Sequence, residues 1–564
     1  MTRRPTRRLA ALALAAAAPA ITGCGDGSGP GQAILDCDEA APTALAPGQA
    51  RLADAAEVAC VRLVEAGTGG AEYLYVAYSA AGEETSGGTS AEYELTGGGG
   101  TPPPAAVAGA GAGAGGATPV HAFHRRLRAT ERELARSRSV GRPGPVADLR
   151  SADEPPTPGE ERTFNVLRSA SAPGTTPGDY VQVDGTARYV GSRVAIFVDV
   201  EAPVQGGYSP FDLEAIGALF DDHLHAIAVS AFGTETDVNG DGMVLVLLTG
   251  QVTRLAGCGQ GQFVAGLFFA VDLFPGAVGS NDAEIFYGLV PDASCGVDRE
   301  RALQVLPGVF IHEFQHMINY GQKVIVRDGE PEDTWLNEGL SGFGEELGAR
   351  LVPADRCPAS DCVTQFHREN LVNAYDYLEQ EDSAYLIGPS DPPIGLTQYG
   401  SAWLFVRWLV DHFAEDAALG TDLTRALVQT TRVGTENVTA ATGESFDRLV
   451  GEWQLANYLE GRPELAALTA GTRYQYTSWD LAGTFGSFHE QSPGDFTRPY
   501  PVEPDVTSGE AYAASGTLRA GSGRHVVVEH AGAGAAVDLR LTAPGGESPL
   551  PAEAAPNTII LRLR

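Results

Sequence analysis

The chain has 564 residues, of which 43% are hydrophobic and 20% are charged, and 72 acidic residues against 38 basic ones give a formal net charge of −34. Its length is sufficient for two or three folded units with sizeable cores. A chain this acidic has no basic surface to neutralise phosphates, so we expect no nucleic-acid partner.

The first 23 residues have the pattern of an export signal. Four arginines among the first eight residues precede an apolar run, residues 9–20, that is too short to span a membrane as a mature helix. Residues 21–24 read Ile-Thr-Gly-Cys and resemble the bacterial lipobox, whose cysteine is lipidated and becomes the mature N-terminus. We therefore expect a lipid anchor at Cys24, a tether over residues 24–33, and a cell-envelope lipoprotein on the periplasmic or cell-surface face. Ordinary signal cleavage is the alternative.

Six cysteines remain after Cys24, an even number for an exported chain, and they predict three disulfide bonds. Their grouping along the sequence favours three local pairs: Cys37 with Cys60, Cys258 with Cys295, and Cys357 with Cys362. Zinc binding by these residues is the alternative, but none shows the CxxC spacing of a structural zinc site.

The N-terminal third alternates between structured and low-complexity segments. Residues 34–96 contain short apolar runs separated by Gly/Ser turns, which is typical of a small β-rich module. Residues 97–178 are rich in Gly, Ala and Pro and are predicted to be a linker. Within it, residues 120–136 form an arginine-rich helical pattern, which we interpret as a solvated helix.

Residues 179–465 are predicted to be the main globular domain, with an α+β order of elements. Strand patterns precede one long helical pattern that begins near Arg299. Ser209 and Pro210 provide an N-cap and a first-turn proline for an earlier amphipathic helix. The expected strands are residues 181–183, 194–200, 243–248, 266–274 and 284–289. Residues 470–564 return to strand patterns separated by Gly and Pro and predict a C-terminal β-sandwich-like module.

A turn rich in side-chain oxygens precedes the strand at residues 243–248. Asp237, Asn239 and Asp241 resemble the start of a calcium-binding loop, but the twelfth position is Leu248, where an EF-hand requires glutamate. A structural turn is therefore the favoured interpretation, and a Ca²⁺ site of another type is the alternative.

Residues 312–316 read His-Glu-Phe-Gln-His within a segment whose apolar residues follow helical spacing. One helical turn separates His312 from His316, so both imidazoles lie on the same face, as two zinc ligands require. Glu313 would then act as the general base on a zinc-bound water without binding the metal.

A catalytic zinc needs a third protein ligand and keeps a position open for water. Glu338 lies 22 residues after His316, far enough for a loop and a return on an antiparallel helix. Because Gln322 stands where the third histidine of a metzincin would be, that arrangement is excluded. Glu338 is therefore the predicted third ligand.

These segments, HEFQHMINY followed by WLNEGLS, resemble the hyicolysin family of neutral zinc metallopeptidases, within the gluzincin group. The resemblance also takes in Ser280-Asn281, residues 284–287 (EIFY) and residues 399–405 (YGSAWLF), and it spans roughly residues 179–460. It implies a thermolysin-like domain, with a mixed-sheet subdomain and a helical subdomain that carries the HExxH helix. Two histidines and one glutamate would bind Zn²⁺, and the activity would be that of a secreted endopeptidase.

One position departs from the gluzincin pattern. Thermolysin-like enzymes carry an acid that supports a ligand histidine, and Gly342 stands there in this chain. Because such partners orient the ligands and raise their basicity, another group must replace it, and Glu345 and Glu346 are the candidates. Tyr399 is predicted, by analogy with tyrosines of related gluzincins, to stabilise the oxyanion, with a packed core tyrosine as the alternative.

The sequence thus predicts a monomeric zinc endopeptidase that hydrolyses peptide bonds of extracellular or periplasmic proteins. Its peptide substrate would pair with the edge of one of two strands, residues 266–274 or residues 284–287. An inactive protease fold serving as a surface-binding or adhesion lipoprotein is the first alternative, although Glu313 favours an enzyme. A zinc aminopeptidase is the second, but no Gly-x-Met-x-Asn-type motif precedes the helix.

Overall fold

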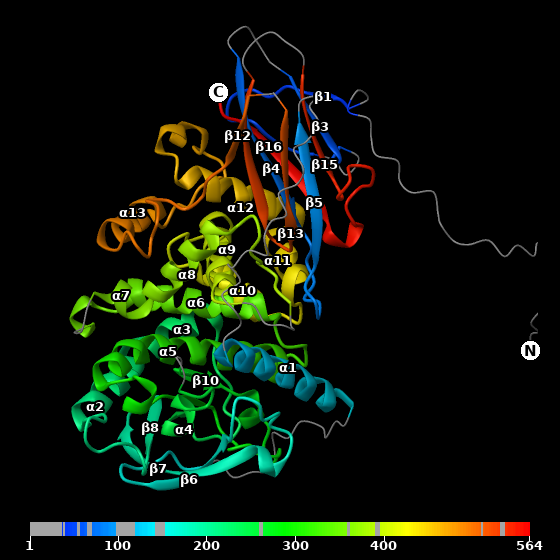
Figure 1. Cartoon of the computed structure of the whole chain (residues 1–564). Helices are drawn as coiled ribbons and strands as arrows, with labels where there is room; N and C mark the ends of the chain where they lie inside the picture. The colour runs from blue at the N-terminus through cyan, green and yellow to red at the C-terminus, as the bar shows by residue number, and fades with distance from the viewer. Residues whose placement is uncertain are drawn as a thin grey trace, which may run out of the picture.

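The computed structural model describes residues 37–564, apart from residues 38–39, 54–56, 65–69, 98–118, 141–152, 259–262, 358–360, 390–394, 509–510 and 531–535. The molecule is elongated, with a mixed α+β part at one end, a helical part in the middle and a β-sandwich at the other end (Figure 1). The predicted export signal, the predicted lipid-anchor residue Cys24 and the predicted tether lie outside the described residues. The described helices include none that is long and apolar enough to cross a membrane.

The α+β part is built on a mixed six-stranded sheet with the order β10-β11-β9-β8-β7-β6. β8, β9 and β11 run parallel to one another, and β10 joins β11 antiparallel at the edge. The strands of this sheet are β6 (Glu161–Leu167), β7 (Tyr180–Val190), β8 (Val194–Asp199), β9 (Val244–Leu248), β10 (Gly266–Phe268) and β11 (Ile285–Gly288). β6 lies inside the segment predicted to be a linker, so the globular domain begins earlier than residue 179. Its alternating strand pattern was masked by the surrounding Pro and Gly.

Helices cover one face of this sheet and continue into the middle of the molecule. The long helix α5 (Arg299–Tyr320) lies against the sheet, and α6 (Thr334–Leu351) packs beside it. The remaining α-helices are α2 (Pro210–Leu219), α3 (His225–Phe232), α4 (Gly250–Thr253), α7 (Cys362–Phe366), α8 (Arg368–Glu379), α9 (Thr397–Phe413), α10 (Thr421–Val428), α11 (Gly434–Thr442), α12 (Phe446–Glu460) and α13 (Leu481–Gln491). One large apolar core runs from the sheet through these helices to the β-sandwich.

The β-rich segments at the two ends of the chain form one sandwich instead of two modules. Its sheets have the orders β1-β3-β15-β5-β13 and β12-β14-β4-β16-β2. The strands are β1 (Pro42–Thr43), β2 (Ala50–Leu52), β3 (Cys60–Leu63), β4 (Ala71–Ser79), β5 (Ser90–Gly97), β12 (Asp505–Thr507), β13 (Tyr512–Arg519), β14 (Gly523–His530), β15 (Val537–Thr542) and β16 (Pro556–Arg562). β4 and β5 each lie between two strands from the C-terminal region, so the N-terminal strands are an integral part of this fold.

Helix α1 (Pro119–Val140) contradicts the prediction of a solvated helix. Phe123, Leu127 and Arg128 are only 2%, 3% and 4% exposed, and α1 lies between the α+β part and the helical part (Figure 1). The sequence prediction counted its arginines as solvent-facing charges. It could not foresee that one of them lies beside buried carboxylates on other elements.

The three predicted cysteine pairs are confirmed. The Cα atoms of Cys37 and Cys60 lie 5.5 Å apart, those of Cys258 and Cys295 lie 4.4 Å apart, and those of Cys357 and Cys362 lie 5.3 Å apart, each pair joined as a disulfide. Each bond closes a short stretch of chain, which limits the conformations of the unfolded state.

Candidate metal centre

Helix α5 places His312 and His316 on one face while its apolar residues fix it in the core. Asp298 caps its first turn by accepting a hydrogen bond from the backbone N–H of Arg301 (2.8 Å). Phe310 and Phe314 are fully buried beneath the helix. Because the apolar stripe anchors the opposite face, the two imidazoles point toward α6.

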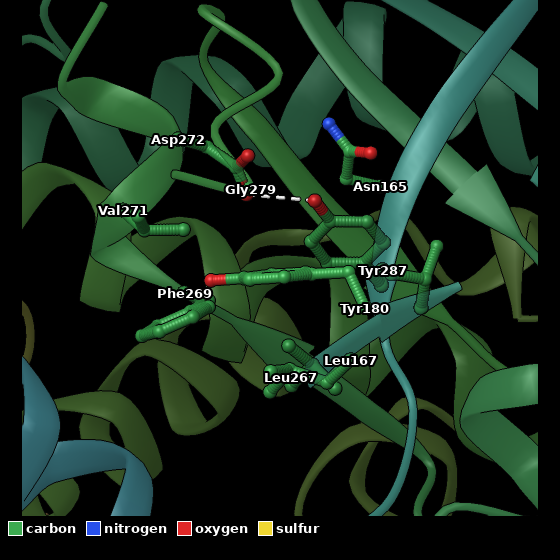
Figure 2. A pocket seen from close by; sticks show the side chains of 10 residues that line it. Asn165, Leu167, Tyr180, Leu267, Phe269, Val271, Asp272, Gly279 and Tyr287 are labelled. Carbon is green, nitrogen blue, oxygen red and sulfur yellow. Dashed lines mark hydrogen bonds between the residues drawn. The ribbon is translucent and has the colours of Figure 1, made fainter. Parts of the chain in front are cut away.

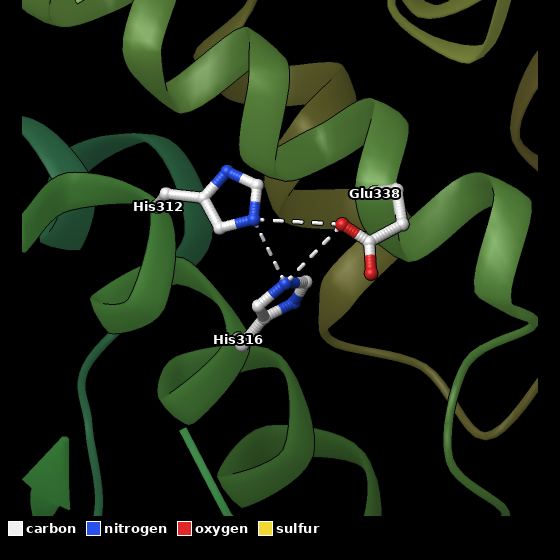
Figure 3. Close-up of side chains that lie close together, drawn as sticks. All are labelled: His312, His316 and Glu338. Carbon is white, nitrogen blue, oxygen red and sulfur yellow. Dashed lines mark hydrogen bonds and ion pairs between the residues drawn. The ribbon is translucent and has the colours of Figure 1, made fainter. Parts of the chain in front are cut away.

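Helix α6 brings Glu338 to the same point. Nε2 of His312 and Nε2 of His316 lie 3.2 Å apart, and Oε2 of Glu338 lies 3.4 Å from the first and 3.5 Å from the second (Figure 3). Among the described residues, these three form the one group of at least three His, Cys, Asp or Glu side chains whose potential ligand atoms all lie within 4.8 Å of one another. The three residues predicted as ligands therefore meet in space, although 22 residues separate the second histidine from the glutamate.

A second layer of polar groups orients the imidazoles. Oε1 of Glu345, one of the two predicted supporting acids, lies 2.7 Å from Nδ1 of His312, and its other oxygen accepts from the side-chain amide of Asn370 (3.0 Å). The hydroxyl of Ser341 lies 3.2 Å from Nδ1 of His316. His312 is held through Nδ1, which leaves its Nε2 directed at the other two groups, the arrangement that metal-binding histidines require. The Ser341 hydroxyl also lies 3.4 Å from Nε2 of His316, so it contacts both nitrogens of that ring.

Gly342 is closely packed at the position where thermolysin-like enzymes carry the supporting acid. A Cβ atom at this position would lie 3.1 Å from Oδ1 of Asn370 and 3.4 Å from Cβ of Trp403. Helices α8 and α9 therefore press against α6 at this point. The supporting carboxylate comes instead from Glu345, nearly one turn further along the same helix.

Glu313 lies beside the group and contacts the edge strand of the sheet. Its Oε2 accepts a hydrogen bond from the backbone N–H of Phe268 in β10 (2.8 Å), and its side chain is 4% exposed. Gly266 allows this approach, because a Cβ atom there would lie 2.3 Å from a methyl group of Val309 on α5. Burial raises the pKa of Glu313 to about 7 against the lowering effect of His312, so the carboxyl group can accept and release a proton near neutral pH.

The charges of the group suit a cation. Burial lowers the pKa of His316 to about 4, so its imidazole is neutral at pH 7 with a free lone pair. Burial acts in the same direction on His312, but the hydrogen bonds that its ring donates to the carboxylates of Glu338 and Glu345 raise its pKa well above the ordinary value. Metal binding would release that proton. Oε1 of Glu338 is buried without a hydrogen-bond partner, an arrangement that a bound cation would compensate.

A cleft of about 360 Å³ opens onto this centre. It is lined by His312, Glu313 and Glu338, and by Tyr399 from the start of α9. Tyr399 thus reaches the site where the sequence prediction placed it. His124 of α1 lines the same cleft and was missed, because nothing in the sequence of an arginine-rich helix indicated that it would face residues nearly two hundred positions away.

In the turn considered for Ca²⁺, the side-chain oxygens accept hydrogen bonds from backbone N–H groups of the same turn. Asp241 accepts from the N–H of Met243 (2.8 Å), Asp237 accepts from the N–H of Gly242 (3.2 Å), and Asn239 accepts from the N–H of Asp241 (3.2 Å). These bonds close the turn before β9. The geometry therefore favours the structural interpretation of the sequence.

A buried polar cluster fixes the chain that follows the edge strand β10. Asp272, 1% exposed, accepts from the hydroxyl of Tyr287 (2.7 Å) (Figure 2). It also accepts from the backbone and side-chain N–H groups of Asn281 (2.8 and 2.9 Å). Burial raises the pKa of Asp272 to about 7. Asn281 and Tyr287 belong to the segments quoted for the family resemblance, and they contribute here to the position of β10 and not to the metal group.

Together the fold and the site define an α+β protein with a buried His-His-Glu group that could hold a metal ion and a neighbouring glutamate on a cleft. No protein-family model matches the chain. Neutral metalloprotease ShpI of Staphylococcus hyicus is 30% identical over 134 residues, which are 23% of this chain and 30% of that relative. The similarity thus supports a relationship to metalloproteases over part of the chain.

Proposed function

We propose that the protein is a zinc-dependent endopeptidase of the gluzincin type, with a thermolysin-like catalytic domain, anchored through Cys24 at the cell envelope. The observation that carries the proposal is the meeting of His312, His316 and Glu338 beside Glu313 on an open cleft. Two histidines, one carboxylate and an accessible side are the donor set of catalytic zinc sites in peptidases. The partial similarity to a neutral metalloprotease supports the same reaction class.

Each residue has a defined task in this reaction. Zn²⁺ held by the three ligands would lower the pKa of a water molecule and polarise the scissile carbonyl group. Glu313 accepts the proton of the attacking water and passes it to the leaving amine. Tyr399 lines the cleft and donates its hydroxyl hydrogen to the developing oxyanion. Burial raises the pKa of Tyr399, so it keeps that hydrogen.

The peptide substrate is proposed to lie along the outer edge of β10, the edge that does not pair with β11. Just outside this strand pair, Ala265 accepts a hydrogen bond from the backbone N–H of Leu289, so the alternation of an antiparallel pair directs the N–H groups of Gly266 and Phe268 away from β11. Glu313 contacts this edge at Phe268. An extended chain added to the edge would therefore bring a peptide bond next to the general base.

Removing and restoring the metal tests this proposal. The purified full chain is expected to contain about one equivalent of zinc and to hydrolyse casein. Dialysis against a chelator should abolish hydrolysis, and added Zn²⁺ should restore both metal content and activity. Absence of both bound zinc and hydrolysis would leave the binding-protein alternative, whereas unchanged hydrolysis after the zinc is removed would exclude a role for zinc in the reaction.

The role of Glu345 predicts a change in metal affinity with little change in fold. Glu345→Gln should weaken zinc binding about 10–100-fold, because it replaces the carboxylate that holds Nδ1 of His312 by a neutral amide. Competition with a chromophoric chelator measures the affinity. Glu369→Gln, a largely exposed acid that lines the same cleft, is the matched control, and equal affinities in the two variants would refute this role.

A further inference from the structure

Helix α1 bridges the two halves of the molecule across the candidate site. On one side, Phe123 and Leu127 belong to the same apolar cluster as the residues on one face of the sheet. On the other side, the guanidinium of Arg132 donates to the hydroxyl of Thr334 in α6 (2.7 Å) and to Glu84 (2.6 Å), and Arg125 donates to Gln398 in α9. The helix is thus held from both walls of the cleft.

Glu131 of α1 binds a backbone N–H group just beyond the edge strand that the substrate needs. The backbone N–H of Ala270, just beyond β10, donates to Oε1 of Glu131 (3.0 Å). The hydroxyl of Tyr320 in α5 donates to the backbone carbonyl of Glu131 (3.3 Å). A peptide strand paired along β10 beyond Phe268 would require the Ala270 N–H and the space in which α1 lies, so peptide and helix cannot be bound together.

The side chain of Arg128 extends from α1 to the candidate metal group. Its Nη1 lies 2.6 Å from Glu131, its Nε lies 3.9 Å from Oε1 of Glu338, and its side chain is 5% exposed. His124, one turn earlier, lines the cleft beside the predicted ligands. α1 therefore places a buried positive charge against the carboxylate ligand and narrows the approach to the centre.

We infer that α1 is a built-in inhibitory helix, which lies in place of the substrate on the edge strand and must be displaced before an extended polypeptide can bind. The inference rests on the proposed function and adds a substrate class to it. With α1 in place, the remaining cleft of about 360 Å³ admits short peptides, and long chains are excluded by competition with the helix.

The test loosens α1 without altering the metal ligands, Glu313 or Tyr399. Arg125→Ala combined with Arg132→Ala removes the contacts to α9, α6 and Glu84, and Leu127→Glu places a charge in the apolar contact by a separate route. Glu133→Ala changes an exposed residue of the same helix and is the matched control. Casein hydrolysis should rise about tenfold in both loosened variants and stay unchanged in the control. Hydrolysis of a four-residue peptide should change less than about twofold, because only long chains compete with the helix.

A second readout does not require turnover. Each variant is combined with Glu313→Gln, and binding of a fluorescent twelve-residue peptide is followed by anisotropy. The loosened variants should bind about tenfold more tightly than the protein carrying Glu313→Gln alone, and a synthetic peptide with the sequence of α1 should compete. Unchanged peptide affinity in both loosened variants would overturn the inhibitory role. If the loosened variants bind the peptide more tightly, but no variant that retains Glu313 hydrolyses casein, the inhibitory role is kept and the peptidase function is rejected.

Discussion

Replacing Glu313 by glutamine should lower the rate of casein hydrolysis by about 10²–10⁴-fold while the protein keeps its zinc. The amide retains the size of the side chain but cannot accept the proton of the attacking water. Glu313 is not among the three predicted ligands, so the metal group stays complete. Hydrolysis is measured by release of acid-soluble peptides, and zinc by elemental analysis of the same samples.

Glu300→Gln is the matched control for that experiment, because it makes the same change in the exposed first turn of the same helix. Its activity should equal that of the unchanged protein. If Glu313→Gln retains full activity, the general-base role is wrong. If it loses its zinc, the effect belongs to the metal group and not to proton transfer.

Replacing Glu346 by alanine should lower the free energy of unfolding by about 3–5 kcal/mol, because it removes one of the two carboxylates, the other being Asp411, that pair with the buried guanidinium of Arg407. Oε1 of Glu346 lies 2.9 Å from Nη1 of Arg407, and neither side chain is exposed to solvent. The indole N–H groups of Trp403 and Trp479 also donate to this carboxylate (2.9 and 2.8 Å). Urea denaturation followed by tryptophan fluorescence measures the loss.

The matched control for Glu346 is an exposed ion pair of the same type. Glu436→Ala breaks the contact with Arg432 (3.4 Å), in which the side chain of Arg432 is 53% exposed and that of Glu436 is 76% exposed. This variant should change the free energy of unfolding by less than about 1 kcal/mol. A loss at Glu346 no larger than at Glu436 would show that the buried network contributes nothing to stability.

The same carboxylate predicts a dependence on acid. Burial would raise the pKa of Glu346, but Arg407, His367 and Arg350 outweigh it and lower the pKa from 4.5 to about 2. A group whose pKa is lowered by folding stabilises the protein fully above its unfolded value and loses that contribution as the pH falls through the folded value. Between pH 4.5 and 2, the unchanged protein should therefore lose stability more steeply than Glu346→Ala. Parallel stability curves over this range would contradict the assignment.

Neighbouring glutamates on α6 show how far sequence reasoning could go. Glu345 and Glu346 were equivalent candidates for supporting a ligand histidine, since both lie about one turn after Gly342. A helix turns by about 100° per residue, so adjacent side chains face different neighbours. Glu345 faces His312, whereas Glu346 faces Arg407 and two tryptophans. The positions of α8 and α9 decide between them, and these are not local properties of the sequence.

The His-His-Glu group could be predicted because its residues follow a recognisable spacing over short stretches of sequence. His312 and His316 share a helix face by periodicity alone, and the same segment carries Glu313. Glu338 needed one further step, a return helix, and the structure places it 3.4 Å from His312. The disulfide pairs were likewise accessible, because each joins cysteines that are neighbours among the six.

The sequence by itself determined the α+β class, the HExxH helix and the identity of the three side chains that meet beside it, because these depend on helical and strand periodicity over short distances. Only the tertiary structure decided that strands from both ends of the chain share one sandwich and that α1 lies across the site. Both depend on contacts between residues that are distant in sequence. In the sandwich, these contacts are hydrogen bonds between backbone groups, which do not depend on the identity of the side chains. In α1, nothing local distinguishes the buried Arg128 from a solvated arginine, because the carboxylate of Glu338 that it approaches belongs to a distant segment of the chain.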